Sequence, residues 1–70
     1  MIRQPVSSSN LSSVGYDAAS NTLEIAFHNG GIYQYDAVPS SIHQGLLSAP
    51  SKGQYFHQHI KNVYSYRKVG

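Results

Sequence analysis

Four histidines and three acidic residues are the side chains in this 70-residue chain that could hold a metal ion. His57 and His59 lie two residues apart in a predicted helix, so they project about 200° apart around its axis and cannot chelate one ion. His28 and His43 have no Asp, Glu or Cys at ligand spacing. Because a metal site needs three or four converging ligands, we expect no metal and no other cofactor.

Serine or carboxylate catalysis is not supported by the spacing of the residues it would need. A serine nucleophile requires an oriented base and an oxyanion hole, whereas helix capping accounts for Ser40, Ser41 and Ser51. Glu24 and Asp36 could approach each other across a hairpin, where repulsion raises the pKa of one carboxyl. On a solvated face that repulsion is small. We therefore expect that the chain is not an enzyme.

Basic and aromatic residues near the C-terminal end form a better candidate site. Cations that bind phosphates, interleaved with rings on which bases stack, are the composition that a nucleic-acid surface needs. The candidate nucleic-acid-binding residues are Lys52, Lys61, Tyr64, Tyr66, Arg67 and Lys68. The competing interpretation is a solvated C-terminus in which Lys61 and Arg67 lie favourably near a helix end. A net charge of +2 keeps the positive surface small.

Tyr33 and Tyr35 admit two interpretations. On an exposed strand they would form a stacking platform for single-stranded bases. On a buried strand they belong to the core, with hydroxyls that reach polar partners at its edge. The choice depends on the register of the hairpin that contains them, because a slip of one residue moves every side chain to the other face.

The elements that position these residues begin with a β-hairpin, which the Asn-Gly-Gly sequence at residues 29–31 predicts. Residues 22–28 form the strand before this turn, and residues 32–37 form the strand after it. Residues 11–16 form an earlier strand, in which Gly15 marks a bulge or a close approach of backbone. The apolar face of the second strand consists of Leu23, Ile25 and Phe27.

Two registers are open to this hairpin. A two-residue loop pairs Phe27 with Ile32 and separates the tyrosines from the apolar face. A three-residue loop over residues 29–31 pairs Phe27 with Tyr33. By the same register, Ile25 pairs with Tyr35. We favour the three-residue loop because it buries the large side chains together. The polar side chains that this register leaves in water are Glu24, Gln34 and Asp36.

Two short helices follow the sheet, which ends at Pro39. Ser40 or Ser41 is expected to cap the first helix, and Pro50 ends it. The apolar positions of this first helix, at i, i+4 and i+7, are Ile42, Leu46 and Ala49. The chain is then an α+β domain, a three-stranded antiparallel meander followed by two short helices packed on one face.

Ser51 and Gln54 have the spacing of a capping box, which begins the second helix. The apolar stripe of this helix consists of Phe56, Ile60 and Val63. The side chains expected to point away from the stripe are Lys52, His57 and Lys61. This arrangement places the lysines and one histidine on the solvent side of the helix.

An ordered set of residues between Ser9 and Tyr64 carries a family resemblance. The set is Ser9, Leu11, Val14, Gly15, Tyr16, Asp17, Leu23, Ile25, Phe27, Gly30, Tyr33, Gln34, Tyr35, Val38, Pro39, Leu47, Ala49, Ser51, Gly53, Tyr55, Phe56, Ile60 and Tyr64. Together these residues resemble the KTSC domain, which is named for its occurrence at the C-terminus of some lysyl-tRNA synthetases. The family also occurs as free-standing proteins in bacteria and their phages. His57 departs from its pattern, in which asparagine follows the Tyr-Phe pair.

The resemblance implies a small domain without established activity, for which association with a tRNA synthetase suggests RNA binding. It also implies that Tyr33 and Tyr35 are family-motif residues with a structural role. Residues 1–8 are expected to be a flexible lead-in, residues 9–64 a single KTSC-like domain, and residues 65–70 a basic and aromatic tail.

The leading functional hypothesis is a non-catalytic accessory domain that binds RNA or other nucleic acid weakly through the second helix and the tail. The alternative is a protein-interaction module, in which short strands with unpaired edges pair with a partner or form a homodimer. The sequence has neither a signal peptide nor a segment that could span a bilayer, so we expect a cytoplasmic protein without membrane partners.

Overall fold

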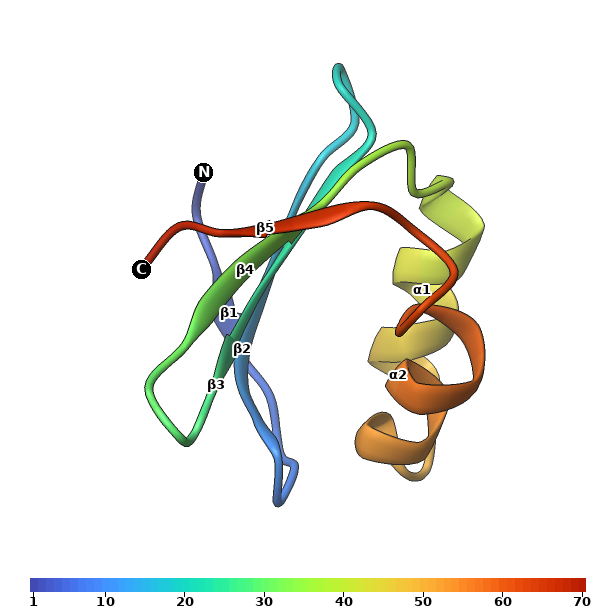
Figure 1. Ribbon diagram of the computed structural model, residues 1–70. Helices are drawn as coiled ribbons and strands as arrows, with labels where there is room; N and C mark the ends of the chain where they lie inside the picture. The colour runs from blue at the N-terminus through green and yellow to red at the C-terminus, as the bar shows by residue number, and fades with distance from the viewer.

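The computed structural model describes residues 1–70 as a five-stranded antiparallel sheet with two helices on one of its faces (Figure 1). The strands are β1 (Gln4–Pro5), β2 (Leu11–Asp17), β3 (Thr22–Phe27), β4 (Ile32–Tyr35) and β5 (Tyr66–Lys68). Each strand pairs with its neighbour in sequence order, and α1 (Ser40–Ser48) and α2 (Lys52–His59) connect β4 to β5. The fold is therefore of the expected α+β class. Neither helix has the length and apolar character needed to cross a bilayer.

The sheet has two more strands than the three expected, and both come from the ends of the chain. Residues 1–8, expected as a lead-in, contain β1, which pairs Gln4 with Val14 of β2. Residues 65–70, expected as a basic and aromatic tail, contain β5, which pairs Tyr66 with Tyr35 of β4. Every residue of β1 and β5 is exposed. Because these edge strands bury no apolar face, their sequences lack the alternation that reveals a strand.

Gly15 of β2 marks a close approach of backbone rather than a bulge. A Cβ atom at Gly15 would lie 2.7 Å from the carbonyl oxygen of Ile2, so a larger residue would push the N-terminal segment away. The irregularity in the pairing of β2 with β3 lies earlier, between Leu11 and Ser13. Gly15 thus allows the segment that carries β1 to lie against the sheet.

The hairpin between β3 and β4 has a three-residue loop, as expected, but the loop spans residues 28–30 rather than 29–31. The Phe27 N–H donates to the Gly31 carbonyl at 2.8 Å, and the Gly30 N–H donates to the Phe27 carbonyl at 2.9 Å. Gly30 has a φ of 102°, a conformation that glycine adopts without strain. This geometry is that of a turn closed by a glycine bulge.

The expected pairing of Phe27 with Tyr33 is therefore wrong by two residues. The structure pairs Ile25 with Tyr33 and Leu23 with Tyr35. A slip of two residues, unlike a slip of one, leaves every side chain on its own face. The tyrosines consequently lie on the apolar face of the sheet, as the burial argument predicts.

The core lies between this face of the sheet and the two helices (Figure 1). Its buried residues are Leu11, Val14, Leu23, Ile25, Tyr35, Val38, Leu46, Phe56 and Ile60. Val63, expected on the apolar stripe of the second helix, is instead 59% exposed. The reason is that α2 ends at His59 and the chain turns at Asn62, whose φ is 63°.

The two helices begin differently. Ser40 and Ser41 do not cap α1, because Pro39 occupies the N-cap position and both serines lie inside the first turn. The Pro39 carbonyl accepts the Ile42 N–H at 3.0 Å. Of the expected capping box of α2, the N-cap half forms, since the Ser51 hydroxyl accepts the N–H of Gln54 at 3.4 Å.

The face of the sheet away from the helices carries a chain of hydrogen bonds between its strands. Arg3 donates to one carboxylate oxygen of Glu24 at 2.5 Å, and the Gln34 amide donates to the other at 2.8 Å. Arg67 donates to the side-chain oxygen of Gln34 at 3.0 Å and to Asp36 at 2.9 Å. The expectation that Glu24 remains in water is wrong: it is 7% exposed, because Arg3 and Gln34 cover and bind it.

Candidate nucleic-acid interface

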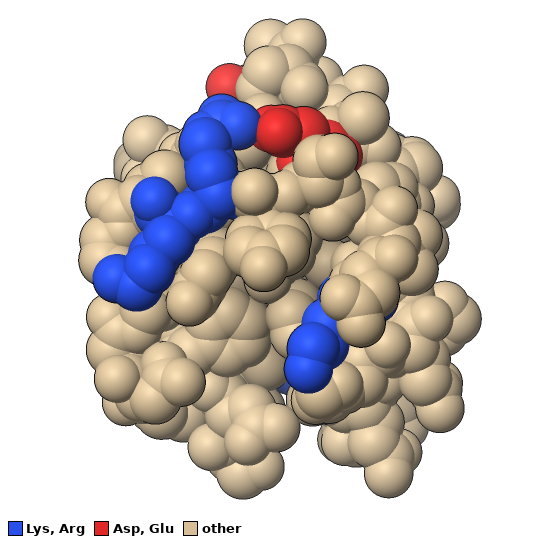
Figure 2. Space-filling model, in the orientation of Figure 1, with Lys and Arg blue, Asp and Glu red and all other residues tan.

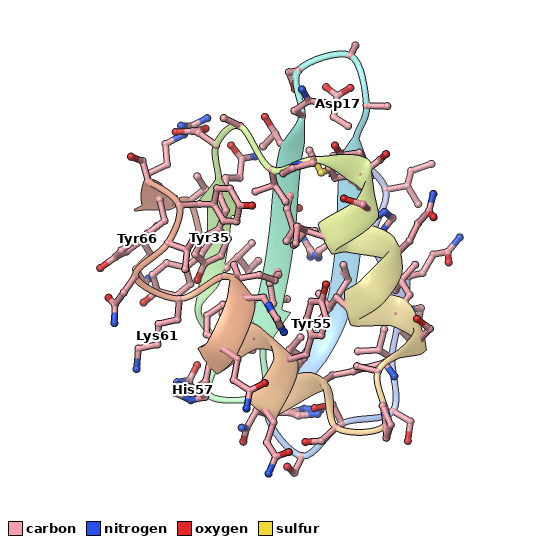
Figure 3. The ribbon with its side chains drawn as sticks, turned by 90° about the vertical axis from the view of Figure 1, so that its right-hand side faces the viewer. Asp17, Tyr35, Tyr55, His57, Lys61 and Tyr66 are labelled. Carbon is pink, nitrogen blue, oxygen red and sulfur yellow. The ribbon has the colours of Figure 1, made fainter.

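An open groove of about 240 Å³ lies between the sheet and the end of α2. Five aromatic rings, two asparagines and one lysine line it: Phe27, Asn29, Tyr33, Tyr35, Phe56, Lys61, Asn62 and Tyr66. We call it the aromatic groove. Figure 3 shows Tyr35 and Tyr66 reaching from the sheet toward the side on which Lys61 projects. The groove therefore combines contributions from three strands, the β3–β4 turn, α2 and the segment after α2.

The rings of the groove are held by contacts with one another. The Tyr66 ring lies 5.7 Å from the Tyr35 ring and 5.8 Å from the Tyr33 ring, measured between centroids. Phe56 packs edge-on against Phe27 at 5.2 Å and against Tyr35 at 5.7 Å. Such tilted and edge-on arrangements are the favourable geometries for aromatic pairs. These contacts hold the rings in a fixed arrangement relative to one another.

The tyrosine rings of the groove differ in how far they are exposed to solvent. Tyr35 is buried and Tyr33 is half-buried, so both belong to the core side of the groove. Burial, followed by the neighbouring phenols of Tyr33 and Tyr66, raises the pKa of Tyr35 to about 12. Tyr66 is 59% exposed and presents ring surface to solvent. Tyr66 thus offers ring surface on which a base can stack, and the rings of Tyr33 and Tyr35 support it.

One of the candidate basic residues lines this groove, and a second leaves the same face of the sheet. Lys61 is exposed and lines it directly. Lys68 lies opposite Tyr33 in the pairing of β4 with β5, so both side chains leave the same face of the sheet. The Lys68 ammonium donates to the Gly70 carbonyl at 2.8 Å. Tyr64 is half-buried against the core and supports the segment between Lys61 and β5.

The other two basic candidates lie elsewhere. Arg67 leaves the opposite face of β5 and forms an ion pair with Asp36 at 2.9 Å. Lys52 is the first residue of α2, and its ammonium donates to the Ala49 carbonyl at 3.2 Å. Figure 2 shows one basic area that meets acidic atoms at its end and a second basic area that lies apart from it. The structure thus does not gather all the candidates into one patch.

Two polar hollows continue from the aromatic groove. The first, of about 290 Å³, shares Phe27, Asn29 and Phe56 with the groove. The second, of about 510 Å³, reaches Lys52. The residues that the second hollow shares with the first are Ser9, Asn10 and His57. No carboxylate lines the groove or either polar hollow.

No three His, Asp or Glu side chains are grouped closely enough to hold a metal ion. His43 stacks on Tyr16 with centroids 4.7 Å apart, and burial lowers the pKa of His43. His28 hydrogen-bonds the Ser8 carbonyl at 3.0 Å. His57, which stands where the family pattern has asparagine, is exposed and lines both polar hollows.

Glu24 and Asp36 do not form a carboxylate pair. Each is bound by a different arginine, Arg3 and Arg67 respectively. The hydrogen bond from Gln34, together with Arg3, lowers the pKa of Glu24 even though burial opposes that change. The direction is opposite to the increase that a pair of repelling carboxyls would produce.

Four residues of the aromatic groove were missed by the sequence analysis as site residues: Phe27, Asn29, Phe56 and Asn62. The phenylalanines carry the signal of core residues, and their edges become groove walls only because α2 packs beside the β3–β4 turn. Asn62 directly follows Lys61, and an asparagine after a helix end is the one local signal that could have drawn attention to it.

Known proteins resemble this chain over nearly its whole length. The KTSC domain family model matches residues 7–64. An uncharacterized protein of Stutzerimonas stutzeri is 44% identical over 61 residues, which are 87% of this chain and 86% of that protein. A solved structure, that of a KTSC domain protein from Yersinia pestis, is 49% identical and has a TM-score of 0.96, with 99% of this chain and 97% of that chain covered.

A segment of a larger enzyme matches as well. Lysine–tRNA ligases of Trichormus variabilis and a Nostoc species are 41% and 43% identical over 54 residues. The match covers 77% of this chain but only 10% of each ligase, so it concerns a small part of those enzymes. The family match and the solved structure confirm the resemblance carried by the ordered residue set: this chain belongs to the KTSC domain family.

Proposed function

We propose that this small domain binds single-stranded nucleic acid weakly at the aromatic groove, with RNA as the preferred ligand. One observation carries the proposal: the exposed ring of Tyr66, its aromatic support and the ammonium of Lys61 surround one open groove that no carboxylate lines. An aromatic surface beside a free cation is the arrangement by which proteins bind single strands.

The chemistry of the groove suits an unpaired nucleotide. Stacking of a base on an aromatic side chain contributes about 1–3 kcal/mol and is open to every base, since each has a π-face. Neither ion pair of the molecule uses Lys61 or Lys68, so both ammonium groups are available to phosphate. Asn29 and Asn62 add amide groups that can hydrogen-bond base edges.

The small net charge supports weak rather than tight binding. With Lys61 at the groove and Lys68 on the same face of the sheet, few counterions are released, and a dissociation constant of about 10–100 μM is expected at physiological salt. RNA is favoured over DNA because the matched segments belong to ligases named for tRNA, whose loops present unstacked bases. Duplexes are disfavoured, since a base must leave its stack to reach the aromatic groove.

Fluorescence anisotropy tests the proposal with labelled single-stranded RNA, structured RNA and single-stranded DNA at two salt concentrations. We expect salt-sensitive binding, tightest for single-stranded RNA. Lys61→Ala should weaken binding severalfold, whereas Arg67→Ala is the matched control, because it removes the same charge from the other face of the sheet. Absence of salt-sensitive binding tighter than about 100 μM contradicts the proposal.

A second candidate function is binding of a protein partner or a second copy of the chain. The supporting observation is Ile2, which is 88% exposed beside a hollow of about 160 Å³ that Leu47 also lines. Burial of such apolar surface is a common source of association energy. Sedimentation velocity over a range of concentrations tests it: association that Ile2→Ser abolishes supports this function, and a monomer at every concentration argues against a homodimer.

A further inference from the structure

We propose that the ligand is an oligonucleotide whose backbone continues from the aromatic groove along α2, through the two polar hollows, to Lys52. The inference rests on the proposed function and extends it, because it states how much of a strand the domain contacts. It also assigns a role to Lys52, which lies at the opposite end of α2 from Lys61.

The continuity of the surface is the first argument. The aromatic groove and the first polar hollow share Phe27, Asn29 and Phe56, and the two polar hollows share three further residues, including His57. Since α2 has eight residues, the track runs beside a helix about 12 Å long. That length exceeds what one nucleotide covers, given about 3.4 Å of rise between stacked bases.

The chemistry of the surface changes along this track. Aromatic rings dominate the groove at one end, whereas the second polar hollow contains no hydrophobic side chain. Its lining is mainly hydroxyl and amide groups, contributed by Ser7, Ser9, Asn10, Gln54 and Gln58. Such groups hydrogen-bond phosphate and ribose oxygens, including the 2′-hydroxyl. The base therefore occupies the aromatic end, and the backbone follows the polar end.

The distribution of charge is the second argument. Glu24 and Asp36 are both bound by arginines on the face of the sheet away from α2. Asp17 is the last residue of β2, at the opposite end of the molecule from His57 and Lys61 (Figure 3). All the acidic residues are thus outside the track, which carries Lys52 at one end and Lys61 at the other. A polyanion meets no repelling carboxylate along it.

Lys52 is available to a phosphate in this arrangement. Its ammonium donates to the Ala49 carbonyl, which uses one of its three N–H groups, and it forms no ion pair. The carbonyl contact also holds the side chain beside the second polar hollow. Lys52 thus provides a second fixed phosphate contact, separated from Lys61 by the length of α2.

The test compares a uridine dinucleotide with an octauridylate, in titrations of the wild type, Lys52→Ala and Lys61→Ala over a salt series. We expect Lys61→Ala to weaken the binding of both ligands. Lys52→Ala should weaken the binding of the octanucleotide alone. It should also lower the magnitude of the slope of log K against log salt by about 0.7, which is the contribution of one phosphate on a single strand. Lys52→Arg keeps the charge and should restore binding, and thermal unfolding confirms that each variant is folded.

Each outcome bears on a separate claim. If the octanucleotide binds no more tightly than the dinucleotide, or if Lys52→Ala leaves octanucleotide binding and its salt slope unchanged, the extended track is wrong while the groove proposal stands. If neither ligand binds the wild type, both proposals are overturned. If Lys52→Ala lowers the affinity for the two ligands equally, the extended track is also overturned, because Lys52 would then act on the groove itself.

Discussion

Tyr66 of β5 lies directly opposite Tyr35 of β4, with their ring centroids 5.7 Å apart. The first residue is largely exposed and the second is buried, so the pair joins the C-terminal segment to the core. Because all three residues of β5 are exposed, this contact adds to the backbone hydrogen bonds that hold the segment, such as that from the Asp36 N–H to the Ser65 carbonyl at 2.9 Å. The same contact also forms the outer wall of the aromatic groove.

Tyr66→Ala should therefore reduce nucleic-acid affinity by about fivefold or more, the equivalent of one lost base stack. The loss of stability should be small, because the side chain is mostly exposed. Tyr66→Phe keeps the ring and should bind as the wild type does. Anisotropy titrations of the three proteins provide the measurement, and an unchanged affinity in Tyr66→Ala contradicts stacking at this residue.

The two ion pairs of the sheet should differ in their contribution to stability. The Arg3–Glu24 pair is mostly buried on its Glu24 side, whereas both side chains of the Arg67–Asp36 pair are exposed. Arg3→Ala leaves a buried carboxylate without its cation and should cost about 1–3 kcal/mol. Arg67→Ala should cost about 0–1 kcal/mol, as exposed pairs do. Urea denaturation measures both, and equal costs would show that the burial of Glu24 does not matter.

Acid should destabilise the domain through Glu24. Its pKa is lowered on folding, first by the hydrogen bond from Gln34, so the ionised carboxylate stabilises the folded state. That contribution is present above the ordinary pKa of 4.5 and is lost as the pH falls through the lower folded value. Glu24→Gln should be less stable at neutral pH and should show a flatter dependence below pH 4.5. If the free energy of unfolding depends on pH in the same way in the wild type and in Glu24→Gln, this account is contradicted.

Alkali should act through Tyr35. Burial raises its pKa from 10.0 to about 12, so the protonated phenol is favoured in the folded state. The contribution of the protonated Tyr35 to the free energy of unfolding is fully present below pH 10.0 and is lost as the pH rises toward about 12. Tyr35→Phe should lose less stability over this interval than the wild type. Ultraviolet absorbance should also show a tyrosine that ionises near pH 12 and that is absent in Tyr35→Phe.

Gly45 of α1 should resist replacement even though glycine weakens a helix. A Cβ at this position would collide with the phenol of Tyr55 on α2. Gly45→Ala should therefore destabilise the domain by about 1–3 kcal/mol, although alanine is intrinsically the better helix former. In a Tyr55→Ala background the same change should instead stabilise by about 1 kcal/mol. Thermal unfolding of the wild type, the two single variants and the double variant shows whether the contact with Tyr55 or helix propensity decides the effect.

Local patterns in the sequence predict the central elements of the fold. The alternation of Leu23, Ile25 and Phe27 identifies β3 and its buried face, and the glycines after it identify a three-residue turn. Ser51 and Gln54 identify the start of α2. In each case the physical cause, a repeat of buried positions or a cap, lies within a few neighbouring residues.

Features that depend on distant residues are not predictable in this way. β1 and β5 bury no face of their own and become strands only because β2 and β4 offer unpaired edges. Glu24 is polar, and its burial follows from Arg3, which is 21 residues away. The aromatic groove requires Phe27, Phe56 and Tyr66 to meet, and neither their spacing nor their composition indicates that contact.

The most direct test of the account is amide chemical-shift mapping of the isotopically labelled domain during titration with octauridylate. The account predicts salt-sensitive shifts that begin at Lys61, Asn62 and Tyr66 and extend along α2 to Lys52. Shifts confined to the surface around Ile2 and Leu47, or no shifts with an RNA excess, would contradict it and remove the aromatic groove as the binding site.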